Sequence, residues 1–154
     1  MGWLISPERR LSNLLKTDRD EAFYGSMDPE EATQVVDLSF AEDVAAGDHE
    51  FMETLLRTFL RNVASLRTEL DGAVAAADGP RIRRVSHGLK GLFQTMGALP
   101  AAEAALSVEK SEAVTLVQLG PSLASLTDAM SRVELAVQCV VTERYSAAPR
   151  AELG

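Results

Sequence analysis

The sequence is poor in cysteine, in aromatic residues, and in glycine and proline. Its 154 residues include one cysteine, Cys139, so no internal disulfide can form and no thiol-based metal cluster can be built. Aromatic residues make up 5% of the chain, which disfavours a β-sandwich or a β-barrel, while alanine and leucine are abundant. We therefore expect an all-α protein in the reducing environment of the cytoplasm.

Basic charge and long hydrophobic runs are also scarce. The 15 lysines and arginines face 23 aspartates and glutamates, a net charge of -8, which argues against general binding to nucleic acid or to an anionic membrane. The apolar run from Trp3 to Ile5 is too short for a signal peptide, and no apolar span of about 18 residues occurs, so we expect no membrane insertion. The 46% hydrophobic and 25% charged residues are typical of a globular protein.

Prolines and apolar spacing divide the chain into helices. Four prolines precede segments with helical periodicity and fit the first turn of a helix, namely Pro29, Pro80, Pro100 and Pro121. Apolar residues then recur at steps of three and four, most regularly from Phe51 to Val74. We expect helices over about 28–47, 48–79, 80–97, 100–106 and 121–144.

This succession predicts an up-down four-helix bundle with an additional N-terminal capping helix. Residues 1–27 are expected to be an N-terminal extension or linker, because a charged run and Gly25-Ser26 follow a short apolar stretch. Residues 28–145 form the predicted bundle, and residues 146–154 the predicted flexible C-terminal tail.

The helix predicted over 80–97 carries the most informative residue, His87. At about 100° per residue, the apolar residues of this helix fall on one arc opposite His87, namely Ile82, Val85, Leu89, Leu92, Phe93 and Met96. Four other residues lie within roughly 60° of His87, namely Arg83, Lys90, Gly91 and Gln94. The wheel therefore predicts that His87 faces solvent among basic and small residues.

The neighbours of His87 indicate phosphoryl chemistry. Each glycine inside a helix destabilises it by about 0.8–1 kcal/mol relative to alanine. Gly88 and Gly91 therefore indicate that the surface beside His87 must stay free of side chains. An exposed neutral imidazole is a nucleophile at pH 7, and the ammonium of Lys90, one turn away, can hold the dianionic group of its phosphoryl adduct. Hydrolysis would need a carboxylate or a second base, and the sequence predicts none within a helical turn of His87.

The run His87-Gly88-Leu89-Lys90-Gly91, followed by Gly97, resembles a family signature. It is similar to the histidine-containing phosphotransfer domains of multistep phosphorelays, whose signature is His-x-Leu-Lys-Gly with a glycine six residues later. The likeness extends over about residues 36–144, roughly 70% of the chain, and includes Gly47-Asp48 and Phe59-Leu60 upstream.

The resemblance implies a four-helix bundle with a phosphorylatable histidine on its second helix. It implies that His87 is the phosphoacceptor, that Lys90 stabilises the phosphoryl group, and that Gly91 gives a receiver domain room to approach. Gln94 lies where the family often has a polar contact to the imidazole or the phosphoryl group. In two places the sequence departs from the family, at Leu92 and at Leu106-Ser107.

The function implied is a relay in which His87 accepts a phosphoryl group from a receiver-domain aspartate and passes it to another response regulator. A hybrid sensor kinase is a further expected partner, and Arg83, Arg84 and Gly88 are expected to join Gly91 in partner binding. No glycine-rich phosphate loop is present, so we expect a phosphocarrier without an ATP site rather than an enzyme. No bound cofactor or metal is expected, and Mg²⁺ only in the receiver-domain partner.

Several alternatives stay open from the sequence. The bundle could bind or sequester a receiver domain without transferring anything, or the chain could be a phosphotransfer domain cut from a larger sensor kinase. Arg83 and Arg84 either steer an acidic receiver surface or form a solvated face. His49, with Glu50 nearby, is either half of a metal site or a solvated surface residue.

Overall fold

The computed structural model describes residues 27–146, and within this range the chain is all-α. The predicted N-terminal extension and C-terminal tail fall outside the described residues, except for Met27 and Ser146. The helices are α3 (Pro29–Val35), α4 (Ser39–Ala45), α5 (His49–Ala75), α6 (Gly79–Thr95), α7 (Leu99–Glu109) and α8 (Leu116–Val141), followed by the π-helical turn η2 (Thr142–Ser146).

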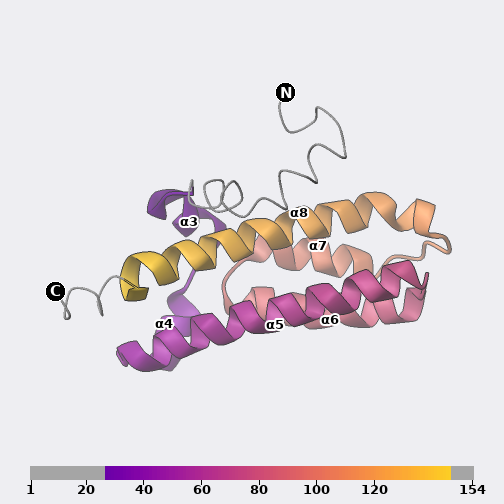
Figure 1. Cartoon of the computed structure of the whole chain (residues 1–154). Helices are drawn as coiled ribbons and strands as arrows, with labels where there is room; N and C mark the ends of the chain where they lie inside the picture. The colour runs from indigo at the N-terminus through magenta and orange to yellow at the C-terminus, as the bar shows by residue number, and fades with distance from the viewer. Residues whose placement is uncertain (1–26, 147–154) are drawn as a thin grey trace, which may run out of the picture.

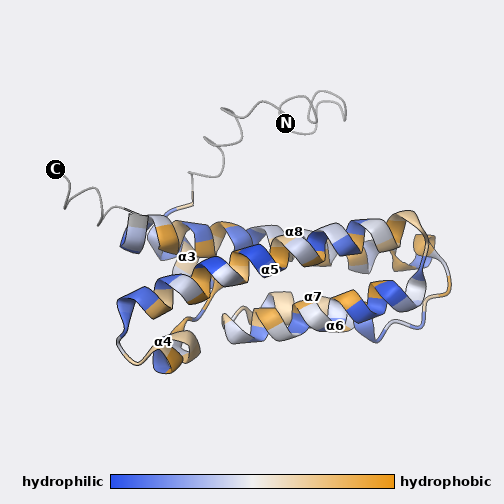
Figure 2. Cartoon of the chain, turned by 60° about the horizontal axis from the view of Figure 1, so that its bottom comes forward, coloured by the Kyte–Doolittle hydropathy of each residue, from blue (hydrophilic) through white to orange (hydrophobic). Residues whose placement is uncertain are grey.

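Helices α5 to α8 form the predicted four-helix bundle. Consecutive helices pack against each other, and α8 returns to contact α5, so that the four enclose one core (Figure 1). Polar and apolar residues alternate along the ribbons, as expected of amphipathic helices packed on one side (Figure 2). The largest fully buried side chains come from all four helices and include Leu56, Val63, Ile82, Leu89, Phe93, Val108, Leu126 and Met130.

The N-terminal part of the bundle differs from the sequence prediction, which placed one helix over 28–47. The structure has two short helices there, α3 on α8 and α4 on α5, with an extended residue, Val36, between them. Asp37 causes the break, because its carboxylate accepts hydrogen bonds from Ser39 N at 3.0 Å and Ser39 Oγ at 2.6 Å. Helical periodicity continued across the break, so the apolar pattern alone did not reveal it.

The start of the last helix also differs from the prediction, because α8 begins at Leu116 and contains Pro121. Thr115 provides the N-terminal cap, its hydroxyl accepting a hydrogen bond from Gln118 N at 3.2 Å. Pro121 lacks an N–H, so it leaves the carbonyl of Val117 without its usual intrahelical donor. Val117 is exposed, and water can serve its carbonyl there.

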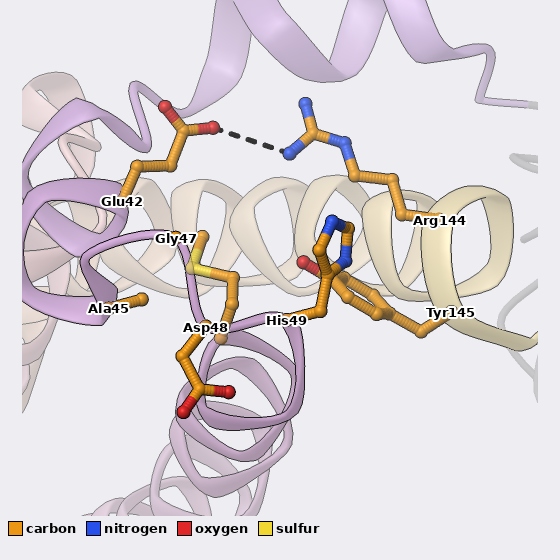
Figure 3. Close-up of a pocket in the computed structure, with 8 residues that line it drawn as sticks. Glu42, Ala45, Gly47, Asp48, His49, Arg144 and Tyr145 are labelled. Atoms are coloured by element: carbon orange, nitrogen blue, oxygen red, sulfur yellow. Dashed lines mark hydrogen bonds and ion pairs between the residues drawn. The ribbon is translucent and has the colours of Figure 1, made fainter.

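The N-terminal end of α5, which begins at His49, lies beside α4 and η2. Arg144 pairs with Glu42 at 3.3 Å, and the His49 ring meets the buried Tyr145 ring edge-on at 5.9 Å between centroids (Figure 3). Among residues 27–146, no group of three or more histidine, cysteine, aspartate or glutamate side chains could hold a metal ion. The structure therefore gives His49 an aromatic neighbour and no set of metal ligands.

The reversal between α6 and α7 is a tight turn over residues 96–98. Gly97 adopts a φ of +64°, and the end of α6 forms a Schellman motif in which Ala98 N donates to Phe93 O at 2.9 Å and Gly97 N to Gln94 O at 3.1 Å. Asp37 N also donates to Met96 O at 3.0 Å, which brings the α3–α4 connection onto this turn. A Cβ on Gly97 would lie 2.1 Å from Asp37 O, so no other residue fits here.

We expect Gly97→Ala to destabilise the protein by more than about 1–3 kcal/mol, because it adds backbone strain to a collision with Asp37. The matched control is Gly91→Ala, where a Cβ would meet nothing within 4 Å and which should be neutral or stabilising by up to about 1 kcal/mol. Urea unfolding of the two variants measures both values. Equal midpoints for the two would contradict the packing described for Gly97.

Candidate functional site

Helix α6 places His87 as the sequence predicts. Asp78 caps the helix by accepting a hydrogen bond from Arg81 N at 3.1 Å, and Pro80 lies in the first turn. The predicted core arc is confirmed, because five of its six residues are buried and Leu92 is half-buried. On the opposite side, the His87 side chain is 64% exposed.

A carboxylate lies against His87, which the sequence analysis did not predict. Glu109, the last residue of α7, brings Oε2 to 2.7 Å from His87 Nδ1. The sequence placed no carboxylate within a helical turn of His87 on its own helix, and the carboxylate comes instead from α7. A signal was present in the sequence: α6 and α7 form a hairpin that turns at Gly97, so residues about ten positions before and twelve after the turn lie at the same height.

Lys90 binds the same carboxylate, with Nζ 3.1 Å from Glu109 Oε1. That oxygen is buried, and the Lys90 ammonium lies against it. The Lys90 ammonium foremost, and the His87 imidazole after it, hold the pKa of Glu109 below its usual value. Glu109 is therefore ionised at neutral pH.

The ionised carboxylate decides which imidazole nitrogen carries the proton. A carboxylate can only accept hydrogen bonds, so we assign the proton of the neutral ring to Nδ1, which donates it to Glu109. Nε2 is then left with its lone pair. The site thus consists of an exposed nucleophilic nitrogen, a carboxylate behind the ring and an ammonium one helical turn away.

The other residues predicted for the site divide into two groups. Gly91 lies exposed with no atom within 4 Å of the position of a Cβ, and Gln94 and Arg84 are exposed side chains. The polar contact of Gln94 with the imidazole or the phosphoryl group, which the resemblance implies, stays a prediction; in the unphosphorylated site the hydrogen-bond partner of His87 is Glu109. Gly88 is half-buried and faces α5, where its Cβ would lie 3.5 Å from Leu66.

Arg83 points away from the open surface. Its Nε donates to Ser111 O at 3.0 Å and its Nη2 to Ala113 O at 2.8 Å, both in the connection between α7 and α8. The side chain is half-buried there. The structure therefore places Arg83 in an intramolecular contact, while Arg84 and Gly91 share the exposed side of α6 with His87.

Within residues 27–146 the chain is an all-α bundle that presents an exposed, carboxylate-paired histidine beside a lysine, an arrangement suited to carrying a group on the imidazole. Comparison with protein-family models agrees, because the Hpt domain matches residues 54–136, more than half of the chain. The chain belongs to the Hpt domain family, whose members are histidine phosphocarriers. Neither curated proteins nor solved structures returned a match. No helix within residues 27–146 is long and apolar enough to cross a membrane.

The lowered pKa of Glu109 predicts how the site affects stability at different pH. A carboxyl group whose pKa is lower in the folded state stabilises the fold above its unfolded-state pKa, and this contribution is lost as pH falls through the folded-state pKa. We expect Glu109→Gln to be less stable than the wild type at pH 7, with the difference shrinking below about pH 4. Urea unfolding at pH 7 and pH 3 measures it.

The control is Glu103→Gln, because Glu103 is an exposed residue of the same helix. Its effect on stability should be small at both values of pH. A Glu109→Gln deficit that stays constant between pH 7 and pH 3 would contradict the charge interactions of Glu109 with Lys90 and His87.

Proposed function

We propose that His87 accepts a phosphoryl group on Nε2 from a receiver-domain aspartate and relays it to another response regulator. The observation that carries the proposal is the 2.7 Å contact between His87 Nδ1 and Glu109, because in the neutral form of this exposed ring it places the proton on Nδ1 and the lone pair on Nε2. Membership of the Hpt domain family supports the same chemistry. The wider context, a relay with a hybrid sensor kinase in the cytoplasm, stays a prediction.

In the proposed step, the Nε2 lone pair attacks the phosphorus of the aspartyl phosphate. The P–N bond forms, the P–O bond to the aspartate breaks, and the aspartate leaves as a carboxylate with the electron pair. Nδ1 keeps its proton throughout, and Glu109 stabilises the positive charge that the ring acquires. Transfer to the next receiver reverses these steps.

Lys90 is proposed to change partner during this cycle. In the unphosphorylated site its ammonium lies 3.1 Å from Glu109 and its side chain is 22% exposed. A phosphoryl group on Nε2 introduces a dianion one helical turn away, which competes with Glu109 for the same ammonium. Gln94, exposed on the same side of α6, is proposed to offer a neutral hydrogen bond to the phosphoryl group.

The receiver domain is proposed to dock along the side of α6 that carries His87, Gly91 and Thr95. These residues lie at successive i, i+4 positions on one side of the helix. Thr95 also lines a groove of about 210 Å³ between α4, α5 and α6. Phe40 and Val44 of α4 border it and are 58% and 47% exposed. We propose that the receiver supplies both the aspartate and Mg²⁺, while this chain binds no metal.

The test is transfer of label from a phosphorylated receiver domain. We expect wild-type protein to take the label on His87 alone, and the adduct to be labile in acid and stable in base, as phosphoramidates are. His87→Gln should abolish labelling, and the control His49→Gln should leave it unchanged. Label that persists in His87→Gln would show that the phosphoacceptor lies elsewhere, and a wild type that takes no label would favour a module that only binds receivers.

Gly91 separates docking from chemistry. We expect Gly91→Lys to be as stable as the wild type, because its Cβ has open space, yet to take label poorly from a receiver, because the long side chain blocks approach to the roughly 3–3.5 Å needed for in-line attack. Labelling by phosphoramidate, a small donor, should be retained. Gly91→Ala is the control and should transfer normally. Normal transfer by Gly91→Lys would mean that the partner does not pass over this turn.

A further inference from the structure

Arg83 connects the helix that carries His87 to the chain that follows Glu109. Its guanidinium donates to two carbonyl oxygens, Ser111 O at 3.0 Å and Ala113 O at 2.8 Å. A planar guanidinium can hold two acceptors at once, which an ammonium on a flexible stem does far less well. Gly79, the first residue of α6, leaves room for this guanidinium, because a Cβ there would lie 3.0 Å from Arg83 Nη1.

The carbonyls that Arg83 holds come directly after α7. The helix ends at Glu109, Lys110 is its C-cap, and Ser111 N still donates to Val108 O at 3.2 Å. The loop is further ordered by Ala113 N, which donates to Ser111 Oγ at 3.1 Å. Because the last turn of a helix lacks some of its own hydrogen bonds, its position depends on what holds the following residues.

Arg83 and His87 are one turn apart on α6, in i and i+4 positions. The helix fixes the distance between them along its axis at about 6 Å, from a rise of about 1.5 Å per residue. On α7 and its loop, Glu109 and Ser111 are two residues apart. Two contacts therefore join the same two segments: Arg83 with the loop, and His87 with Glu109.

We propose that Arg83 is a positioning residue that holds Glu109 against His87 by fixing the end of α7 to α6. It touches neither the imidazole nor the phosphoryl group, and it acts on transfer through the place of the Glu109 carboxylate. This inference rests on the proposed function of His87 as phosphoacceptor. It replaces the role in partner binding expected from the sequence, because the guanidinium is half-buried and engaged with backbone carbonyls.

The first measurement needs no phosphoryl transfer. In the unphosphorylated protein, ¹⁵N NMR of the His87 ring reports which nitrogen carries the proton. We expect the wild type to carry it on Nδ1, Arg83→Ala to distribute it over both nitrogens, and the control Arg84→Ala to match the wild type. Arg83→Lys, which keeps the charge and can reach one carbonyl, should lie in between. An Arg83→Ala spectrum identical to that of the wild type would overturn the proposal.

The second measurement is the rate of labelling by phosphoramidate. We expect Arg83→Ala to be roughly tenfold slower, since a misplacement of about 1 Å in a site can cost up to about 10²-fold. In a background of Glu109→Ala, the same substitution should have no further effect, because both act through one carboxylate. Additive losses would overturn the proposal, as would an Arg83→Ala defect confined to receiver donors, which would assign Arg83 to partner binding.

Circular dichroism of Arg83→Ala establishes whether the bundle is intact, and Arg83→Lys provides the same test if it is not. The two measurements also separate this inference from the proposed function. A wild type that takes label from neither donor would contradict the phosphocarrier role, while the ring-proton measurement would still decide whether Arg83 positions Glu109.

Discussion

The contact between His87 and Glu109 depends on the alignment of α6 with α7. The two residues are 22 positions apart in the chain and meet only because α7 runs back along α6 after a single reversal. That reversal requires Gly97 in a left-handed conformation and close enough to Asp37 O that a Cβ would collide with it. A turn far from any reacting atom thus places the carboxylate that contacts Nδ1 of the imidazole.

The proposed site balances two opposing demands on charge. A carboxylate behind the ring fixes the proton on Nδ1 and supports the positive charge that develops on attack, but it repels an incoming phosphoryl dianion. Lys90 meets both demands, because its ammonium pairs with Glu109 in the resting site and it lies one helical turn from His87.

The sequence predicted the features that follow from periodicity within one helix. It did not predict the contacts that form between two segments distant in the chain. The exposed face of His87, the core arc opposite it and the long helix α5 all follow from periodicity within a continuous segment, and the structure confirms them. Glu109 lies on a different helix from His87, so a helical wheel could not place it. The same limit explains why the contacts of Arg83 were not predicted. Its partners are backbone carbonyl groups of a loop, which every residue type has.

The break after α3 shows how a local polar contact can decide which apolar side chains are buried and which are exposed. Phe40 and Val44 continue the helical spacing of the preceding residues, which would place them on the buried face of one continuous helix. Because the Asp37 carboxylate accepts hydrogen bonds from Ser39, a new helix begins there. This helix, α4, packs on α5 and leaves these two side chains at the edge of the groove. Apolar residues that would have stabilised the bundle are thereby exposed beside the α6 face that carries His87. An exposed apolar surface of this kind is typical of a partner-binding site, and α6 carries both one wall of this groove and the proposed phosphoacceptor, His87.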